Sequence, residues 1–135
     1  MALNRRKTIL VIDDDFAILE MIKYTIDPTL YEVITAMDAE SALDKMEEKV
    51  PDAIVLDIKL PGMSGYLFAA ILQEKEAYKD IPIILLTGTS LLFGNVVMDV
   101  PAAKYRLSKP CDCTKLSDIL DQLFQEDKTS AWSID

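Results

Sequence analysis

The chain has 135 residues, half of them apolar, and its 14 basic and 23 acidic side chains give a net charge of −9. This length predicts one domain. The acidic balance argues against a nucleic-acid surface, because phosphate binding needs clustered Lys and Arg. The absence of histidine excludes a Ser-His-Asp triad, a histidine metal ligand and a phosphohistidine formed on this chain.

Five short segments rich in β-branched and apolar residues alternate along the chain with segments of helical spacing. The strands are predicted at 8–12, 31–36, 53–56, 81–86 and 105–108. Apolar residues recur every three or four positions at 19–26, 39–46, 68–72 and 116–124, which predicts helices there. Asp38, Ser64 and Asp112 stand where N-caps belong. This alternation predicts a parallel α/β sheet with helices on both faces.

The composition of the strands indicates their order in the sheet. Segments 8–12, 53–56 and 81–86 are nearly continuous apolar runs, as strands buried on both faces should be. Segments 31–36 and 105–108 mix polar and apolar residues, which suits edge strands. Right-handed crossovers then favour a five-stranded parallel sheet of order 2-1-3-4-5, although other α/β orders stay compatible with the pattern.

Polar residues follow four of the predicted strands. Asp13 and Asp14 come after the first strand, Asp57 after the third, Thr87 after the fourth and Lys109 after the fifth. The carboxyl ends of parallel strands form the ligand site of such sheets, so the three aspartates should converge. Carboxylates ~4–5 Å apart repel by a few kcal/mol per pair, so a cation or a protonated acid is required. Oxygen ligands alone favour Mg²⁺.

Each of these residues also has a purely structural alternative. Asp15 is expected to cap the following helix, and Asp57 alone could be a turn residue. Thr87 could cap the next segment, and Lys109 could be a solvated lysine. Because four strand ends carry suitable groups together, we favour a functional site.

Hydropathy and cysteine content indicate the cellular compartment. No apolar stretch approaches the ~20 residues that span a membrane, and the polar start lacks the apolar core of a signal peptide. Cys111 and Cys113 form a lone Cys-x-Cys without a second pair, which argues against zinc and fits reduced thiols. We therefore expect a cytoplasmic protein without a membrane partner.

Five sequence strings closely resemble the receiver domain of two-component response regulators, including its chemotaxis-type members. They are ILVIDD at 9–14, IVLD at 54–57, LPGMSG at 60–65, LLTG at 85–88 and LSKP at 107–110. The resemblance implies a flavodoxin-like fold and a signalling protein that is not an enzyme. It divides the chain into an N-terminal extension at 1–7, a receiver domain at 8–125 and a frayed C-terminal tail at 126–135.

The resemblance also implies a chemistry. Asp57 would accept a phosphoryl group from a phosphohistidine on a sensor histidine kinase or a histidine phosphotransfer protein. Thr87 would donate its hydroxyl to one phosphoryl oxygen, and Lys109 would pair with another. Such a phosphorelay is mostly positioning plus neutralisation of oxygen charge.

The same resemblance implies a metal site and a site that controls dephosphorylation. Asp14 would bind Mg²⁺ directly and Asp13 largely through water, with Asp57 and the backbone carbonyl of Lys59 completing the protein ligands. Lys59 and Thr89 would flank the water that attacks the aspartyl phosphate. Neither side chain is a carboxylate or an amide, so we expect slow self-dephosphorylation.

Two departures from the family pattern concern the output. Arg106 occupies the position of the usual switch aromatic, with Tyr105 beside it, which puts the coupling to Thr87 in doubt. Segment 91–98 is unusually apolar. We expect a partner or homodimer surface formed by that segment, strand 105–108 and the last helix, because a soluble domain exposes an apolar patch mainly for binding.

Two rival functions stay open. Asp13-x-Asp15 after a strand imitates the nucleophile motif of haloacid-dehalogenase-type phosphatases, although Ala17 replaces the usual Thr or Val and no downstream acidic pair is evident. The second rival is a receiver-like protein-interaction module that is never phosphorylated. Nucleic-acid binding by this domain is not expected.

Overall fold

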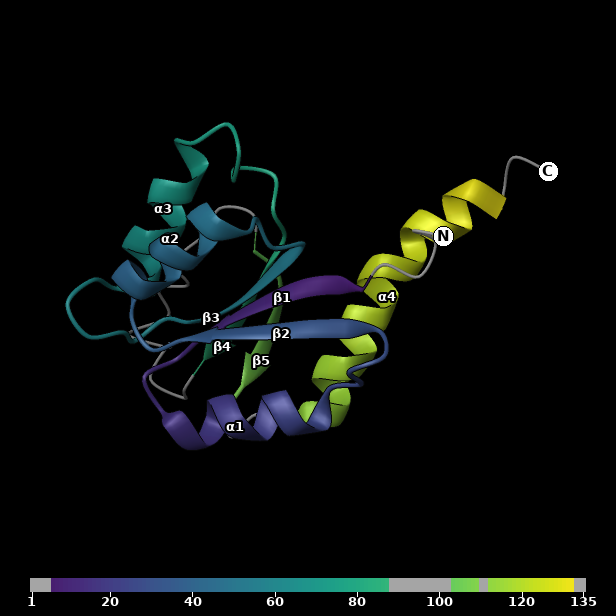
Figure 1. The fold of residues 1–135 in the computed structure, drawn as a ribbon, viewed down its shortest axis with the longest axis horizontal. Coiled ribbons are helices and arrows are strands. Elements are labelled where there is room, and N and C mark those ends of the chain that lie inside the picture. Colours follow the sequence, from purple (N-terminus) through teal and green to yellow (C-terminus); the bar gives the residue numbers. More distant parts are fainter. Residues whose placement is uncertain (1–5, 88–102, 110–111, 133–135) are drawn as a thin grey trace, which may run out of the picture.

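The computed structural model describes residues 6–87, 103–109 and 112–132, with residue 87 and residues 126–132 described by their backbone alone. One sheet contains five parallel strands in the order β2-β1-β3-β4-β5, which confirms the predicted fold class (Figure 1). The strands are β1 Lys7–Ile12, β2 Tyr31–Ala36, β3 Ala53–Asp57, β4 Ile83–Thr87 and β5 Ala103–Ser108.

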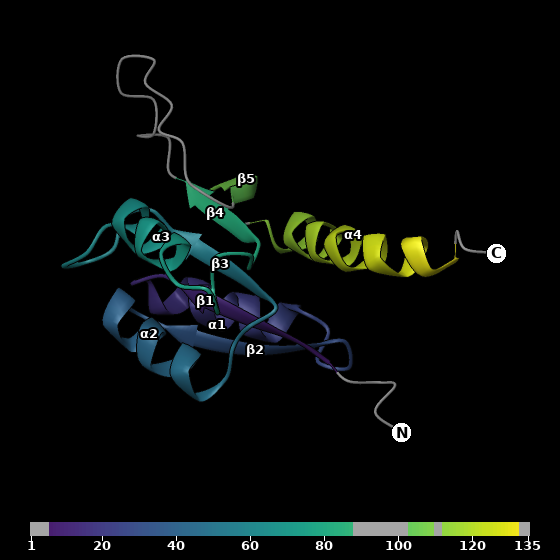
Figure 2. The ribbon, with the colours of Figure 1, turned by 90° about the horizontal axis from the view of Figure 1, so that it is seen from above.

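Helices cover both faces of this sheet, as predicted. Helices α1 and α4 pack on one face, and α2 and α3 pack on the other (Figures 1 and 2). The bounds are α1 Phe16–Thr25, α2 Ala39–Glu48, α3 Gly65–Gln73 and α4 Cys113–Trp132. The apolar segment 91–98 lies outside the described residues. No described helix combines the length and apolarity needed to cross a bilayer.

The inner strands are buried on both faces. Along β1, Ile9 and Val11 pack with α1 and α4, whereas Leu10 and Ile12 pack with α2 and α3, because successive side chains alternate across a strand. All four side chains are at most 2% exposed. The edge strands β2 and β5 are only partly buried. The near-continuous apolar runs therefore identified the inner strands.

Polar side chains cap the N-termini of the helices at the predicted positions. Asp15 caps α1 by accepting hydrogen bonds from the backbone nitrogens of Ala17 and Ile18. Its expected role as a helix cap is confirmed. The other side chains that accept such bonds are Asp38 for α2, Ser64 for α3 and Asp112 for α4.

Several element boundaries differ from the sequence expectation, and three of these differences matter most. Strand β4 begins at Ile83 rather than at residue 81, because Pro82 has no N–H to donate to a neighbouring strand. Strand β5 begins two residues earlier than expected, at Ala103. Helix α4 continues to Trp132, so the segment after residue 125 begins as helix rather than as frayed chain.

Candidate functional site

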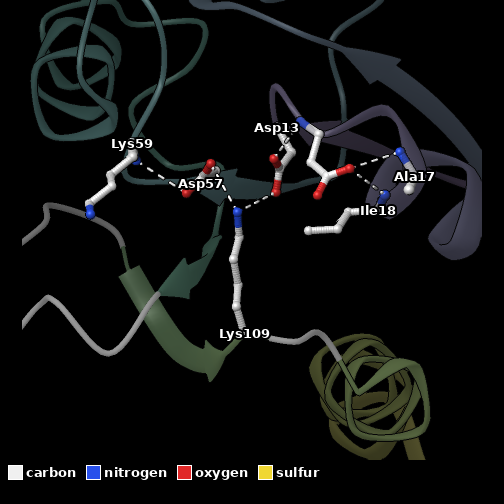
Figure 3. A network of polar contacts seen from close by, with 7 residues as sticks. Asp13, Ala17, Ile18, Asp57, Lys59 and Lys109 are labelled. Carbon is white, nitrogen blue, oxygen red and sulfur yellow. Dashed lines mark hydrogen bonds and ion pairs between the residues drawn. The ribbon is translucent and has the colours of Figure 1, made fainter.

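The sheet brings Asp13, Asp57 and Lys109 to one point at the carboxyl ends of its strands (Figure 3). Asp13 directly follows β1, and Asp57 is the last residue of β3. These two strands are neighbours, and their pairing continues to the end of β1, where Ile12 lies opposite Leu56. Lys109 directly follows the edge strand β5 and reaches back across the end of the sheet.

The ammonium group of Lys109 lies between two buried carboxylates. Its Nζ is 3.0 Å from Asp13 Oδ2 and donates a hydrogen bond of 3.1 Å to Asp57 Oδ2. Asp13 is fully buried, and Asp57 is 3% exposed. A lysine this close to two buried carboxylates offsets part of their repulsion.

Backbone amides hold the other oxygen of each carboxylate. The nitrogen of Asp15 donates to Asp13 Oδ1 at 2.9 Å, and the nitrogen of Lys59 donates to Asp57 Oδ1 at 3.1 Å. Asp13 Oδ2 is buried and accepts no hydrogen bond of good geometry, although the Lys109 ammonium stands beside it. Burying a carboxylate oxygen without a hydrogen bond costs free energy, so this atom could favourably accept an additional cationic partner.

Burial and charge shift two pKa values in the site. Burial raises the pKa of Asp13 above its usual value, and the hydrogen bond from Asp15 and the nearby Lys109 only partly offset this. Burial lowers the pKa of Lys109, but its contacts with Asp13 and Asp57 outweigh that effect and raise the pKa overall. Lys109 therefore stays protonated at neutral pH.

Asp14 completes an acidic cluster that fits a divalent cation. Carboxylate oxygens of Asp13, Asp14 and Asp57 lie within 4.8 Å of one another, and Asp14 is exposed to solvent. Within the described part of the chain, these three carboxylates stand against the single ammonium of Lys109, which leaves two negative charges in excess. Hard oxygen donors of this kind select Mg²⁺ or a similar ion, and the orphaned Asp13 Oδ2 agrees with this fit.

Lys59 contributes its backbone rather than its side chain. Its amide contacts Asp57, while the exposed side chain points away from the aspartates (Figure 3). The following loop is closed by Gly65, whose nitrogen donates to the carbonyl of Ile58 at 2.8 Å. A Cβ on Gly65 would lie 2.5 Å from the Asp57 carbonyl oxygen. The sequence interpretation assigned no role to Gly65, although this glycine ends the LPGMSG string.

The remaining residues expected at the site are described only in part. Thr87 ends β4 at the carboxyl edge, opposite Ser108 in β5, and only its backbone is described. Thr89 lies outside the described residues. On β5, Tyr105 is partly buried against the core beneath α1 and α4, whereas Arg106 is exposed.

Comparison with known proteins agrees with this fold and this acidic site. The sequence model of the response regulator receiver domain matches residues 9–121, and the chain belongs to this family. Two curated relatives are transcriptional regulatory proteins. The alkaline phosphatase synthesis regulatory protein PhoP of Bacillus subtilis is 37% identical over 77% of this chain and 42% of its own length. The phosphate regulon regulatory protein PhoB of Pseudomonas aeruginosa is 42% identical over 61% of this chain and 36% of its own length.

Solved structures show the same likeness over most of the chain. The chemotaxis response regulator CheY4 of Vibrio cholerae has a TM-score of 0.75 at 29% identity, covering 87% of this chain and 98% of its own. The receiver domain of the Pseudomonas aeruginosa sensor kinase PA1611, which holds a magnesium ion in its active-site cleft, has a TM-score of 0.75 at 26% identity. That match covers 87% of this chain and 96% of the other. The present chain spans less than half the length of the two curated relatives.

Proposed function

We propose that Asp57 accepts a phosphoryl group from a phosphohistidine on a sensor histidine kinase or a histidine phosphotransfer protein. The observation that carries this proposal is the buried Asp57 carboxylate, which lies beside two further aspartates and a lysine at the end of the sheet. The phosphohistidine must belong to a partner, because this chain contains no histidine.

The transfer is a displacement at phosphorus. A carboxylate oxygen of Asp57 forms the new P–O bond while the P–N bond to the partner's imidazole breaks. The imidazole nitrogen keeps the electron pair of that bond and takes up a proton. The receiver acts as the acceptor and assists only its own phosphorylation and dephosphorylation, so it is not a turnover enzyme.

Magnesium would be held by Asp13, Asp14, Asp57 and the backbone carbonyl of Lys59. When bound, it supplies positive charge that neutralises the phosphoryl oxygens. The exposed position of Asp14 supports direct coordination by this residue. Asp13 Oδ1 accepts the hydrogen bond from the Asp15 amide, and Oδ2 has the Lys109 ammonium beside it, which supports a contact with the metal largely through water.

Lys109 and Thr87 would bind the transferred group. The Lys109 ammonium now contacts Asp13 and Asp57 and lies within reach of any group attached to Asp57. A phosphoryl oxygen would take over part of that carboxylate contact as another charge-assisted hydrogen bond. The place of Thr87 at the end of β4, next to β3, supports its hydroxyl as a second donor.

The output surface would be formed by segment 91–98, β5 and α4. Arg106 is exposed on β5, and Tyr105 on the opposite side of the strand packs against the α4 side of the core. A guanidinium offers planar, bidentate hydrogen bonding that the usual aromatic switch residue lacks. This surface would bind a partner or a second copy of the chain after phosphorylation.

Both rival functions are weaker. The phosphatase motif requires Asp15 as a free acid, but its carboxylate is engaged as the N-cap of α1. An unphosphorylated interaction module would have no use for two buried carboxylates that share one lysine, because their excess negative charge is costly without a bound cation.

Phosphorylation by acetyl phosphate with Mg²⁺ tests the proposal. Intact-mass measurement should show one added phosphoryl group on the wild-type chain and none on Asp57→Asn. Asp44→Asn, which changes an exposed aspartate of α2, is the matched control and should be labelled normally. A label that persists on Asp57→Asn refutes the assignment. A wild-type chain that neither takes the label nor binds beryllofluoride with Mg²⁺ supports the interaction module instead.

A further inference from the structure

A second polar cluster lies at the amino end of the sheet, opposite the acidic site. Lys7 and Tyr31 are the first residues of β1 and β2, and they pair with each other across the two strands. The hydroxyl of Tyr31 donates a hydrogen bond of 2.6 Å to Asp121 Oδ1 on α4. Residues 90 positions apart in the sequence are therefore joined directly.

Aromatic contacts accompany this hydrogen bond one helical turn further along α4. The rings of Tyr31 and Phe124 lie 6.1 Å apart at an interplanar angle of 42°. The ammonium of Lys7 stands 5.3 Å from the centre of the Phe124 ring. Both distances are in the range of favourable aromatic and cation–π contacts. We call Lys7, Tyr31, Asp121 and Phe124 the helix lock.

The hydrogen bond of the lock is a stable one. Tyr31 is only 6% exposed. Burial, together with the neighbouring Asp121, raises the pKa of Tyr31 well above its usual value, so its hydroxyl remains a donor at any physiological pH. Hydrogen bonds to a charged partner are about twice as strong as neutral ones.

Apolar contacts alone leave the direction of α4 incompletely determined. Leu116, Leu120 and Leu123 are buried against the sheet, but the hydrophobic effect that favours this burial is itself non-directional. Beyond Phe124 the helix continues for eight residues to Trp132, and Figures 1 and 2 show this part leaving the body of the domain. A directional contact close to Phe124, where α4 leaves the domain, can fix the direction of the rest of the helix.

We propose that the helix lock fixes the rotation and direction of α4, so that the C-terminal part of this helix leaves the domain as a rigid extension. The lock is separate from the phosphoacceptor site: α4 begins near Lys109 at one end of the sheet and is held by Tyr31 at the other. This role goes beyond the proposed phosphoryl transfer and does not depend on it.

Amide hydrogen exchange on Tyr31→Phe tests the lock, because this change removes one hydroxyl and keeps the ring. Loss of a hydrogen bond to a charged partner corresponds to about a tenfold or larger increase in local opening. We expect that increase for amides of residues 119–132, with unchanged exchange in β3 and β4. Tyr24→Phe removes the same hydroxyl from a tyrosine of α1 that is 82% exposed, and it should change nothing.

Equal acceleration across the whole domain would show only a general loss of stability and would overturn the proposal, as would unchanged exchange in α4.

A distance measurement gives a second readout. Spin labels at Glu47→Cys on α2 and Gln125→Cys on α4, with Cys111 and Cys113 changed to Ser, should give a narrow distance distribution. Tyr31→Phe should broaden it; an unchanged width contradicts the lock. If Tyr31→Phe does not fold, Phe124→Leu, which keeps the apolar contact, serves in both experiments.

Discussion

At the scale of single residues, the acidic site places more negative charge in the interior than it neutralises. Asp13 and Asp57 are both buried, and they share the one ammonium of Lys109. Two carboxylates near one cation leave a net charge in a region of low dielectric, which is unfavourable for the folded state. The arrangement suits a protein that needs this charge for binding rather than for stability.

Asp13→Asn should therefore stabilise the metal-free domain. The replacement removes the excess charge and leaves Lys109 in a balanced pair with Asp57. We expect the free energy of unfolding at pH 7 to rise by about 1–2 kcal/mol in urea denaturation. Asp44→Asn on the surface of α2 is the control and should have no comparable effect. A loss of stability in Asp13→Asn would contradict this account of the site.

The gain in stability from Asp13→Asn should depend on pH. The folded-state pKa of Asp13 lies above its ordinary value of 3.8, so its ionised form is disfavoured in the folded protein. The contribution of Asp13 to the stability of the wild type is therefore fully present below pH 3.8 and is lost as pH rises through the raised pKa. The advantage of Asp13→Asn should shrink as pH falls towards 3.8. Saturating Mg²⁺ should also reduce it, because metal binding stabilises the wild type.

Lys59 is expected to set the lifetime of the aspartyl phosphate. Its side chain points away from Asp57, and it offers no oxygen that could orient an attacking water. Lys59→Glu or Lys59→Asn should shorten the lifetime by about tenfold or more, measured as the loss of phosphoryl mass with time. Lys59→Met removes the charge without adding an acceptor and should leave the lifetime long. Equal lifetimes in all three variants would refute the proposal.

At the scale of elements, the approach of α3 to β3 holds the backbone around Asp57. Gly65 begins α3, and a Cβ there would meet the carbonyl oxygen of Asp57 at 2.5 Å and the Cα of Ile58 at 2.8 Å. Both are backbone atoms, so a side chain could be accommodated only by moving the helix or the strand. Glycine at this position is thus a requirement of packing and not of backbone conformation.

Gly65→Ala should destabilise the domain by about 1–3 kcal/mol in urea denaturation, because it overpacks this contact. The direction of this change in stability is informative, since alanine otherwise stabilises a helix relative to glycine. The change should also slow labelling of Asp57 by acetyl phosphate. Gly62→Ala is the control: its φ of 79° makes alanine strained, but no atom lies within 4 Å of the added Cβ. It should lower stability while leaving the labelling rate unchanged, and equal rates in both variants would contradict the positional role of Gly65.

Local signals made several elements predictable, and tertiary contacts explain those that were missed. The N-caps were readable because an aspartate or serine acts on amides only two or three residues away. The start of β4 was missed because the apolar run includes Pro82, which has no N–H to donate to a neighbouring strand. The role of Gly65 and the Tyr31–Asp121 bond were not predictable, because each depends on segments brought together only by folding.

At the scale of the whole molecule, patterning favoured the sheet order that the structure shows, and this order places the site. Buried runs identified the inner strands, and adjacent inner strands brought Asp13 and Asp57 together as expected. What the sequence did not reveal is that Lys109 spans both carboxylates, because its reach depends on the position of β5 at the edge. The convergence of Asp13 and Asp57 was thus predictable from the strand order, whereas the contact of Lys109 with both carboxylates was not.

Self-association is the whole-molecule property on which charge and apolar surface act in opposite directions. The net charge of −9 makes two copies repel. The edge strand β5, in contrast, exposes Lys104 and Arg106, which can attract the acidic surface of a second copy. Segment 91–98, which we expect on the same face, has six apolar residues among its eight. We expect a dimer through this face that forms only when its contacts outweigh the overall repulsion.

Beryllofluoride with Mg²⁺, which mimics phosphorylation of Asp57, should tighten this dimer by about tenfold in sedimentation equilibrium. Added salt should strengthen it further, because screening reduces the long-range repulsion between two acidic molecules more than it reduces the short-range contacts within the interface. Phe93→Asp or Val97→Asp should abolish the dimer by placing a charge in an apolar contact. Leu30→Asp, which changes a 50% exposed leucine before β2, is the matched control and should dimerise normally. A monomer under every condition, or equal weakening in the Leu30→Asp control, would show that this face is not a self-association surface.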